Sequence, residues 1–407
     1  MKNVEVIYPG EIFAPNGAST VVRLLYDYRS NFAKNGVNCI FNSTDIHNNE
    51  LISSKPSKVS SKKTSTSLIG KLKKIIRNIL YKLLPDGLLL DFIKIYLTFM
   101  LVAKRVVKRS CSQSNSISNG AVFIHDIFTC YYYLKYRKND NRPILLVLHN
   151  NGETFKMLSY YYPRIKNSWV MRIFNKIENR VLKGIDELVF VSNNSARVFI
   201  ENHPNFQKNR VNVVYNGIPD KPNINKRKET SKYEICCVAS ITDRKGQEII
   251  VDALARLTSD KRSILHITFV GDGYLRSHLE CKVKKLKIED SVTFVGNQTN
   301  VDEFLEKSDI FILPSFDEGL PMSIIEAERA KLPIVSTKVA GIPEMIVHEQ
   351  SGLLFNPNVH ELTEIFENID AYDWAKMGPY SYKIFKEKFR IENMINKYSI
   401  LLNKLAK

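Results

Sequence analysis

Two glutamates, Glu318 and Glu326, stand eight residues apart around a predicted helix start. An apolar strand at 310–313 runs into a turn that contains Gly319, and Pro321 is expected in the first turn of the helix, where a missing backbone N–H costs nothing. The unpaired amides of such a helix start suit a phosphate group, and a glycine allows close approach. Two carboxylates beside an anion site fit a sugar nucleotide, because its hydroxyls lie on both sides of a diphosphate.

Each glutamate also has an ordinary structural explanation. Glu318, before the helix, would favour the helix dipole, and Glu326, inside it, would lie on a solvated face. The coincidence of strand, turn, proline and carboxylate spacing favours the functional interpretation over these two separate ones.

A basic turn, Arg244-Lys245-Gly246, follows a predicted strand at 234–239 and opens a predicted helix at 247–257. A lysine at such a turn can neutralise a departing diphosphate, where negative charge grows in the transition state. The arginine can add a two-pronged phosphate contact. An exposed basic pair without function is the alternative.

The segment around the two glutamates resembles the E-x7-E region of retaining glycosyltransferases of the GT-B fold, in particular glycosyltransferase family 4. Three further motifs of that family have similar counterparts in the same order in the C-terminal half, at 292–296, 340–344 and 351–355. An ordered set of this kind is more specific than any one motif.

The resemblance implies a role for each residue. Glu326 would hold the ribose of the donor nucleotide, and Glu318 would contact hydroxyls of the donor sugar. Lys245 and Arg244 would stabilise the leaving diphosphate. The family often has an arginine a few residues before the lysine, whereas this chain has Ala239-Ser240-Ile241 there, so Arg244 is a substitute for it. The amides of the turn would add to the diphosphate site; its residues are Gly319, Leu320, Pro321 and Met322.

Other candidates follow strands elsewhere. His149 ends a predicted strand at 144–148 and matches a family histidine near the transferred sugar, although a structural histidine is nearly as good an explanation. Gly17, in the loop 15–19, resembles a glycine that faces the donor phosphates, and Gly271 resembles one beside the nucleotide base; either loop could also be a plain turn. His125, at another strand end, is a weaker candidate.

The sequence contains no Asp-x-Asp triplet, and its six cysteines form no Cys-x-x-Cys pair and have no histidine at zinc spacing. We therefore expect no metal and no other cofactor beyond a nucleotide-diphosphate sugar as co-substrate. The chain starts directly with an apolar strand pattern rather than a secretory signal. Together these features predict the cytoplasm.

Short apolar runs alternate with amphipathic helices along the chain, which predicts an α/β protein with parallel, doubly wound sheets. At 407 residues two Rossmann-like domains are expected, the GT-B arrangement. Their predicted limits are 1–216 and 217–385, and a last helix within 386–407 would, by the resemblance, cross back to the first domain. Remaining expected elements are a helix at 19–34 and the following strands: 4–8, 37–42, 121–124, 187–191, 211–215, 266–270, 291–295, 310–313 and 333–336.

The region 53–110 interrupts this alternation. Residues 55–109 hold fourteen Lys or Arg and two acidic residues, a local charge of +12 out of the total of +17. Residues 68–84 have the pattern of a basic amphipathic helix, and 88–107 contains only nine consecutive uncharged residues, whereas a membrane span needs about 20. The insertion therefore either lies on an anionic membrane surface or packs on its own domain. Charge confined to one segment argues against a nucleic-acid partner.

These observations predict an enzyme that transfers a hexose or derivative from a nucleotide-diphosphate sugar, with retention at the anomeric carbon. The expected acceptor is a lipid-linked or surface-polysaccharide precursor, as in capsule, exopolysaccharide or lipopolysaccharide assembly. The expected location is peripheral, at the inner face of the cell membrane. A GT-B nucleotide-sugar epimerase and a membrane-associated, non-catalytic scaffold are the alternatives.

Overall fold

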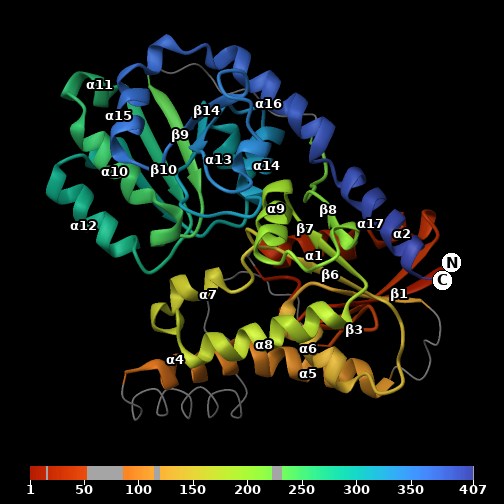
Figure 1. Ribbon diagram of the computed structural model, residues 1–407. Helices are drawn as coiled ribbons and strands as arrows, with labels where there is room; N and C mark the ends of the chain where they lie inside the picture. The colour runs from red at the N-terminus through yellow and green to blue at the C-terminus, as the bar shows by residue number, and fades with distance from the viewer. Residues whose placement is uncertain (15–16, 53–85, 114–119, 222–231, 407) are drawn as a thin grey trace. The chain divides into compact units, whose positions relative to one another are not determined.

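The computed structural model describes residues 1–14, 17–52, 86–113, 120–221 and 232–406. The chain divides into two compact units (Figure 1). The first unit contains residues 1–147, 154–188 and 402–407, and the second contains residues 148–153 and 189–401. Two six-stranded sheets account for the regular strands, apart from one short hairpin of β3 (Ile46–His47) and β4 (Glu50–Leu51).

The first sheet has the strand order β2-β1-β5-β6-β7-β8. Its central strands pair in parallel, with Val4 opposite Cys39 on one side and Ala121 on the other. Its strands are β1 (Lys2–Ile7), β2 (Val37–Asn42), β5 (Ala121–Ile124), β6 (Ile144–Leu148), β7 (Glu187–Phe190) and β8 (Val211–Val213). All residues of β5, β6 and β7 are buried, as expected for a parallel sheet with helices on both faces. The prediction of a parallel α/β sheet is thus confirmed here.

The expected helix at 19–34 is wrong in one respect, because two helices replace it. They are α1 (Gly17–Asp27) and α2 (Arg29–Lys34). The chain leaves helical geometry at Tyr28, whose φ is −95° and ψ is 19°. No glycine or proline marks this break, so no turn could be predicted there from the residue types. Further helices of the first unit are α6 (Ile127–Tyr136), α7 (Lys156–Tyr161) and α8 (Trp169–Gly184).

The described part of the insertion packs on its own unit. It forms α4 (Leu88–Ile95), one π-helical turn (Tyr96–Met100) and α5 (Leu101–Gln113). In Figure 1 α5 runs beside α6, and the two helices are in contact. The buried side of the insertion consists of Leu90, Ile95, Met100, Ala103, Val106 and Val107.

Polar contacts fasten the same insertion to β1. The Ser110 hydroxyl of α5 donates a hydrogen bond to the buried carboxylate of Glu5. Glu5 also forms an ion pair of 2.7 Å with Arg142, and both side chains are 3% exposed. The predicted amphipathic helix at 68–84 lies outside the described residues. In the part of the chain that the structure describes, no helix has the length and apolar character needed to cross a membrane.

The second sheet has the strand order β11-β10-β9-β12-β13-β14. Its strands are β9 (Tyr233–Val238), β10 (Leu265–Val270), β11 (Val292–Gly296), β12 (Ile310–Leu313), β13 (Ile334–Thr337) and β14 (Gly352–Phe355). Every pairing is parallel, and β12 lies directly beside β9, with Ile310 opposite Ile235. Because parallel strands end at the same edge of a sheet, the turns after β9 and β12 must start next to each other.

Helices cover this sheet and leave those turns at its edge. α10 (Gln247–Arg256) packs against α12 (Arg276–Leu286) and α15 (Val359–Glu367), whereas α14 (Met322–Arg329) packs against α16 (Trp374–Lys388) (Figure 1). Shorter helices are α11 (Ser259–Ser263) and α13 (Asp302–Glu306), whereas α9 (Asn193–Asn202) contacts β8 of the first sheet. The last helix, α17 (Ile391–Leu405), ends among residues of the first unit, where the Asn403 amide donates to the carbonyl of Asn35.

Candidate functional site

The basic turn and the glutamate turn meet at the ends of β9 and β12. A short 3-10 turn, Asp243–Lys245, follows β9, and Gly246 then opens α10 with a φ of +67°. A Cβ on Gly246 would lie 2.1 Å from the carbonyl oxygen of Pro314, so no other residue fits without a backbone shift. The Phe316 amide donates a 2.8 Å hydrogen bond to the carbonyl of Arg244. The two turns are therefore joined by backbone contacts, independently of their side chains.

Glu318 is the centre of a buried charge cluster. It is 6% exposed, and its Oε1 contacts the Lys245 ammonium and accepts a 2.8 Å hydrogen bond from the Ser315 hydroxyl. Arg244 Nη1 lies 3.3 Å from Oε2 of the same carboxylate and donates a 2.6 Å hydrogen bond to the carbonyl of Asp317. The structure thus brings together three predicted site residues whose mutual contact the sequence did not predict.

The charge balance of this cluster follows from its contacts. Burial opposes ionisation of Glu318, but the charges of Lys245 and Arg244, with hydrogen bonds from Lys245 and Ser315, outweigh it and lower the pKa of the carboxyl. Glu318 is therefore an anion at neutral pH. Two cations and one anion leave the cluster with a net charge of +1. Such a group can attract a phosphate while the carboxylate remains an acceptor for hydroxyl groups.

Helix α14 begins one residue later than expected. Its first residue is Met322, and Pro321 occupies the N-cap position with an extended ψ of 121°. The prediction of Pro321 within the first turn is therefore wrong, although its carbonyl accepts the Ile324 amide at 3.2 Å, as an N-cap carbonyl does. Leu320 is 5% exposed and anchors the turn, whereas Met322 is half-buried.

Glu326 lies within α14 and is half-buried, while its neighbours Ile325 and Ala327 are fully buried. Glu326 therefore lies on a different side of α14 from the buried core residues. Its proposed contact with a ribose stays a prediction.

Residues 148–153 form a strap between β6 and α7 that carries His149 and belongs to the second unit. Burial lowers the pKa of His149 to about 4, so the imidazole is neutral at pH 7. The side-chain amide of Asn151 donates a 2.6 Å hydrogen bond to the carboxylate of Asp317. Neither Asn151 nor Asp317 was predicted as a site residue, and the only sequence signal was the Asn150-Asn151-Gly152 turn pattern.

The two remaining predicted glycines each have a local structural role. Gly271 follows β10 with a φ of +141°, and a Cβ there would lie 2.0 Å from the carbonyl oxygen of Ala239. It therefore permits close packing at the end of β9. Gly17 is the first residue of α1 in the first unit, and its proposed contact with the donor phosphates stays a prediction. His125 is buried at the end of β5, where it contacts the ring of Phe123 at 4.4 Å.

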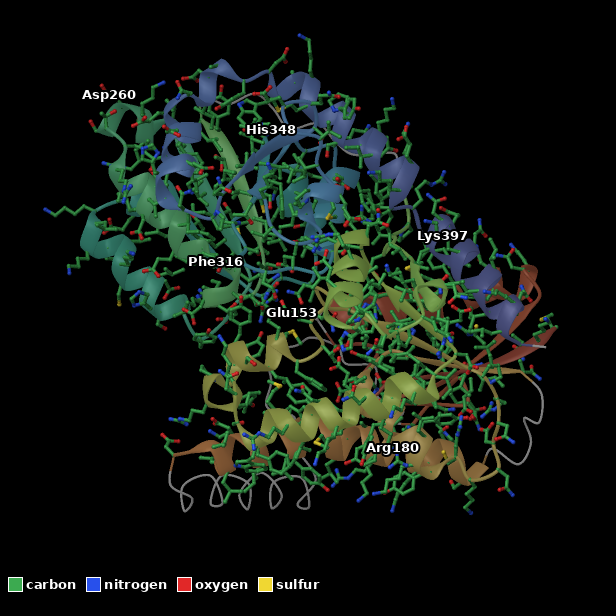
Figure 2. All side chains as sticks on the ribbon, in the orientation of Figure 1. Glu153, Arg180, Asp260, Phe316, His348 and Lys397 are labelled. Carbon is green, nitrogen blue, oxygen red and sulfur yellow. The ribbon has the colours of Figure 1, made fainter. Side chains whose placement is uncertain are left out.

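A hollow of about 220 Å³ lies beside the basic turn. Gly246, which follows Lys245, and Phe316, labelled in Figure 2 and 45% exposed, both contribute to it. The other lining residues are Thr242, Asp243, Gln247, Glu248, Ile249, Asp252, Leu275 and Leu279. None of the predicted site residues lines it, so the charge cluster and this hollow are separate features.

Two family models match consecutive parts of the chain. The model described as Glycosyltransferase Family 4 matches residues 85–221, and the one described as glycosyl transferases group 1 matches residues 220–371. The chain belongs to these GT-B glycosyltransferases. The second match contains the whole charge cluster of Arg244, Lys245 and Glu318.

Relatives and solved structures agree with this family. The chain is 34% identical to the amylovoran biosynthesis glycosyltransferase AmsK of Erwinia amylovora over 36% of this chain and 38% of the relative. It is 28% identical to the N-acetyl-alpha-D-glucosaminyl L-malate synthase of Bacillus anthracis over 55% and 62% of the two chains. The chain thus spans less than two thirds of these relatives. The UDP complex of Anabaena Alr3699/HepE has the same fold, with a TM-score of 0.68 at 17% identity over the full length of both chains.

Proposed function

We propose that the protein is a retaining glycosyltransferase that moves a hexose or derivative from a nucleotide-diphosphate sugar. The observation that carries this proposal is the buried cluster of Glu318, Lys245 and Arg244 at two adjacent strand ends. It combines cations for a leaving diphosphate with an ionised acceptor for sugar hydroxyls. In open α/β sheets, ligands bind at this carboxyl edge of the strands.

Each residue has a defined part in the proposed reaction. The bond from the anomeric carbon to the diphosphate breaks and its electron pair leaves with the diphosphate. The oxygen of the acceptor hydroxyl forms the new bond, and the hydroxyl proton passes to the departing diphosphate oxygen. Lys245 and Arg244 stabilise the charge that grows on the leaving group. Glu318 holds donor sugar hydroxyls, and Glu326 holds the ribose. We propose that these cations make a bound metal unnecessary.

The donor assay tests this directly. Purified protein is incubated with a panel of nucleotide-diphosphate sugars and host membranes, with and without EDTA, and release of nucleoside diphosphate is measured. We expect release with one donor class, unchanged by EDTA, and a loss of release in Glu326→Ala. Glu367→Ala, on the exposed side of α15, is the matched control and should behave like the unaltered protein. Full activity in Glu326→Ala would contradict the proposed role of Glu326.

We propose a lipid-linked or surface-polysaccharide precursor as the acceptor. The relative named for amylovoran biosynthesis supports this class, and the relative named as a malate synthase makes a small soluble acceptor the comparison to include. Product formation on membrane extracts but not on malate is the expected result. A donor that changes configuration without any acceptor would favour the epimerase alternative. A protein that binds donor but consumes none would favour the scaffold.

We also propose attachment to an anionic membrane through residues 55–109, which would place the protein at the inner face of the cell membrane. Within the described part, Arg105 and Lys108 of α5 are exposed. Helix α8 adds an exposed basic side with Arg180, labelled in Figure 2; the others are Arg172, Lys176 and Lys183. Basic side chains attract anionic headgroups at about 1 kcal/mol each.

The membrane test must avoid the packed part of the insertion. Because α5 contributes the buried side chains of Ala103, Val106 and Val107, deletion is confined to residues 55–85, and charge is reversed at Arg105 and Lys108. Binding to vesicles of phosphatidylglycerol and phosphatidylcholine should fall in both variants. Reversal of Lys284 and Lys285, exposed at the end of α12, should leave binding unchanged. Unchanged binding of the deletion variant would refute attachment through this segment.

A further inference from the structure

We propose that Asn151 is a positioning residue for sugar transfer, acting on Glu318 through Asp317. The inference rests on the proposed function, because the effect of Asn151 would be measured as transferase activity. Asn151 is not expected to touch the donor in this role. Its side chain would fix the backbone turn from which Glu318 projects.

The pair formed by Asn151 and Asp317 is buried and short. Asn151 is 7% exposed and Asp317 is 8% exposed, and Nδ2 of the amide lies 2.6 Å from Oδ1 of the carboxylate. The carbonyl of Asp317 accepts a second bond, of 2.6 Å, from Arg244 Nη1. The residue immediately before Glu318 is therefore held through its side chain by the strap and through its backbone by the basic turn.

The orientation of the Asn151 amide is fixed by its own oxygen. Oδ1 accepts the backbone N–H of Glu153 at 3.1 Å, while Nδ2 donates to Asp317 and, at 3.4 Å, to the Glu153 carboxylate. A flipped amide would lose these bonds, because an oxygen cannot donate and an NH2 group cannot accept. The position thus requires a side chain that accepts locally and donates to a carboxylate, and at this length only asparagine does both.

The strap that carries Asn151 is itself rigid. The Asn150 side chain accepts the Gly152 amide at 2.9 Å, and the Asn150 carbonyl accepts the Ser195 hydroxyl at 2.8 Å. Gly152 has a φ of +96°, and a Cβ there would lie 2.2 Å from the Ser195 carbonyl oxygen. An anchored donor can position its partner, whereas a mobile one would follow it.

The contact between Asn151 and Asp317 links the two segments that carry His149 and Glu318, which were predicted as separate candidates. His149 lies two residues before Asn151 on the strap, and Glu318 follows Asp317 in the turn. A Cβ on Gly319 would lie 3.0 Å from the Asn150 carbonyl oxygen, so the backbones of strap and turn are close. The strap and the turn are therefore in backbone contact one residue after His149 and one residue after Glu318.

A swap of donor and acceptor tests the inference. Asn151→Asp alone faces one carboxylate with another and removes the donor, whereas Asp317→Asn alone keeps an amide oxygen that can still accept from Asn151 Nδ2. The double variant Asn151→Asp with Asp317→Asn restores the bond in the reverse direction, and Asp at 151 still accepts the Glu153 amide. A hydrogen bond to a charged group stabilises by roughly 1.5–3 kcal/mol, so Asn151→Asp should lose about 10- to 150-fold in kcat/KM. Asp317→Asn, which keeps a neutral hydrogen bond, should lose less. The double variant should recover most of the loss in Asn151→Asp.

Further readouts separate positioning from general stability. The variants should have a lower kcat. Their Kd for free nucleoside diphosphate, measured by calorimetry, should stay within about twofold of that of the unaltered protein. Activity of Asn151→Asp should rise as pH is lowered, because a proton shared between the two carboxylates restores a donor. Melting temperatures of all variants are recorded, and Asn151→Ala replaces Asn151→Asp if the latter does not fold.

Three results would overturn the inference. These are a double variant no better than Asn151→Asp, equal losses in kcat and nucleotide affinity, or full activity in Asn151→Ala. A protein with natural Asn151 and Asp317 that turns over no donor would overturn the proposed function together with this inference, and so is distinguishable from failure of the swap alone.

Discussion

Replacing Lys245 by methionine is the most informative single perturbation of the charge cluster. Methionine keeps most of the side-chain volume and removes the charge. Glu318 would then retain Arg244 at 3.3 Å and the Ser315 hydroxyl at 2.8 Å as partners. Complete loss of a partner from a buried ion pair costs about 3–5 kcal/mol. Since one cation remains and Lys245 is itself 13% exposed, we expect about 2 kcal/mol of destabilisation.

The lowered pKa of Glu318 determines how the stability should change with pH. Glu318 has a lowered pKa when folded, so its ion pairs add stability above the unfolded value near 4.5, and this stability is lost as pH falls through the lower folded pKa. In Lys245→Met the folded pKa of Glu318 rises, and the loss should begin at higher pH. Urea unfolding at pH 7, 5.5 and 4 measures both effects. The control is Lys285→Met on the exposed end of α12, which should change stability by less than about 0.5 kcal/mol.

A double-mutant cycle with Glu318→Gln isolates the interaction. We expect a coupling free energy of about 1–2 kcal/mol at pH 7 that shrinks as the carboxyl takes up a proton. Donor turnover should fall by roughly 10²–10³ in Lys245→Met, the usual effect of removing one group that stabilises transition-state charge. A coupling near zero at pH 7, or full turnover without Lys245, would refute this account of the cluster.

Three further predictions concern single positions. Gly246→Ala should lower the free energy of unfolding by more than about 1 kcal/mol in urea titrations, because φ is positive and Pro314 blocks the new Cβ; an unchanged value would contradict this. Arg142→Met should cost about 3–5 kcal/mol by the same method, because it leaves the buried Glu5 without its 2.7 Å ion pair, and Glu5→Gln in addition should recover part of that loss. His149→Gln should reduce the loss of unfolding free energy between pH 6 and 4.5, because unfolding of the unaltered protein exposes an imidazole that binds a proton in this range. The unaltered protein should therefore lose at most about 1.4 kcal/mol more per pH unit than the variant.

Most of the fold could be predicted because buried parallel strands are short apolar runs between turns. β12 (Ile310–Leu313) and β6 (Ile144–Leu148) occur at the predicted residues for this reason. β14 (Gly352–Phe355) was identified only as a family motif, since a glycine and three apolar residues do not distinguish a strand from a loop. The break at Tyr28 has no local signal at all, because the side chain neither caps α2 nor forces a turn.

The candidate site could be predicted residue by residue but not as an arrangement. Lys245 and Glu318 are 73 positions apart, and they meet only because β12 adds to the sheet beside β9. Strand order is a long-range property that periodicity does not contain. The partnership of Asn151 with Asp317 was missed for the same reason, since 166 positions separate them. The residue types at the ends of strands can thus be identified from a sequence, whereas the residues that they contact depend on the strand order of the sheet.

The pairing of Glu318 with two cations bears on turnover as well as on stability. Lys245 and Arg244 alone would present a charge of +2 to the diphosphate, both before and after the sugar leaves. An enzyme gains rate only from interactions that strengthen in the transition state, and a site that binds product tightly releases it slowly. The Glu318 carboxylate reduces the charge of the cluster to +1. In the proposed reaction it would also accept hydrogen bonds from the donor sugar, which the nucleotide carries only while the donor is intact. One buried carboxylate can thus favour the donor over the spent nucleotide at the same edge of the sheet.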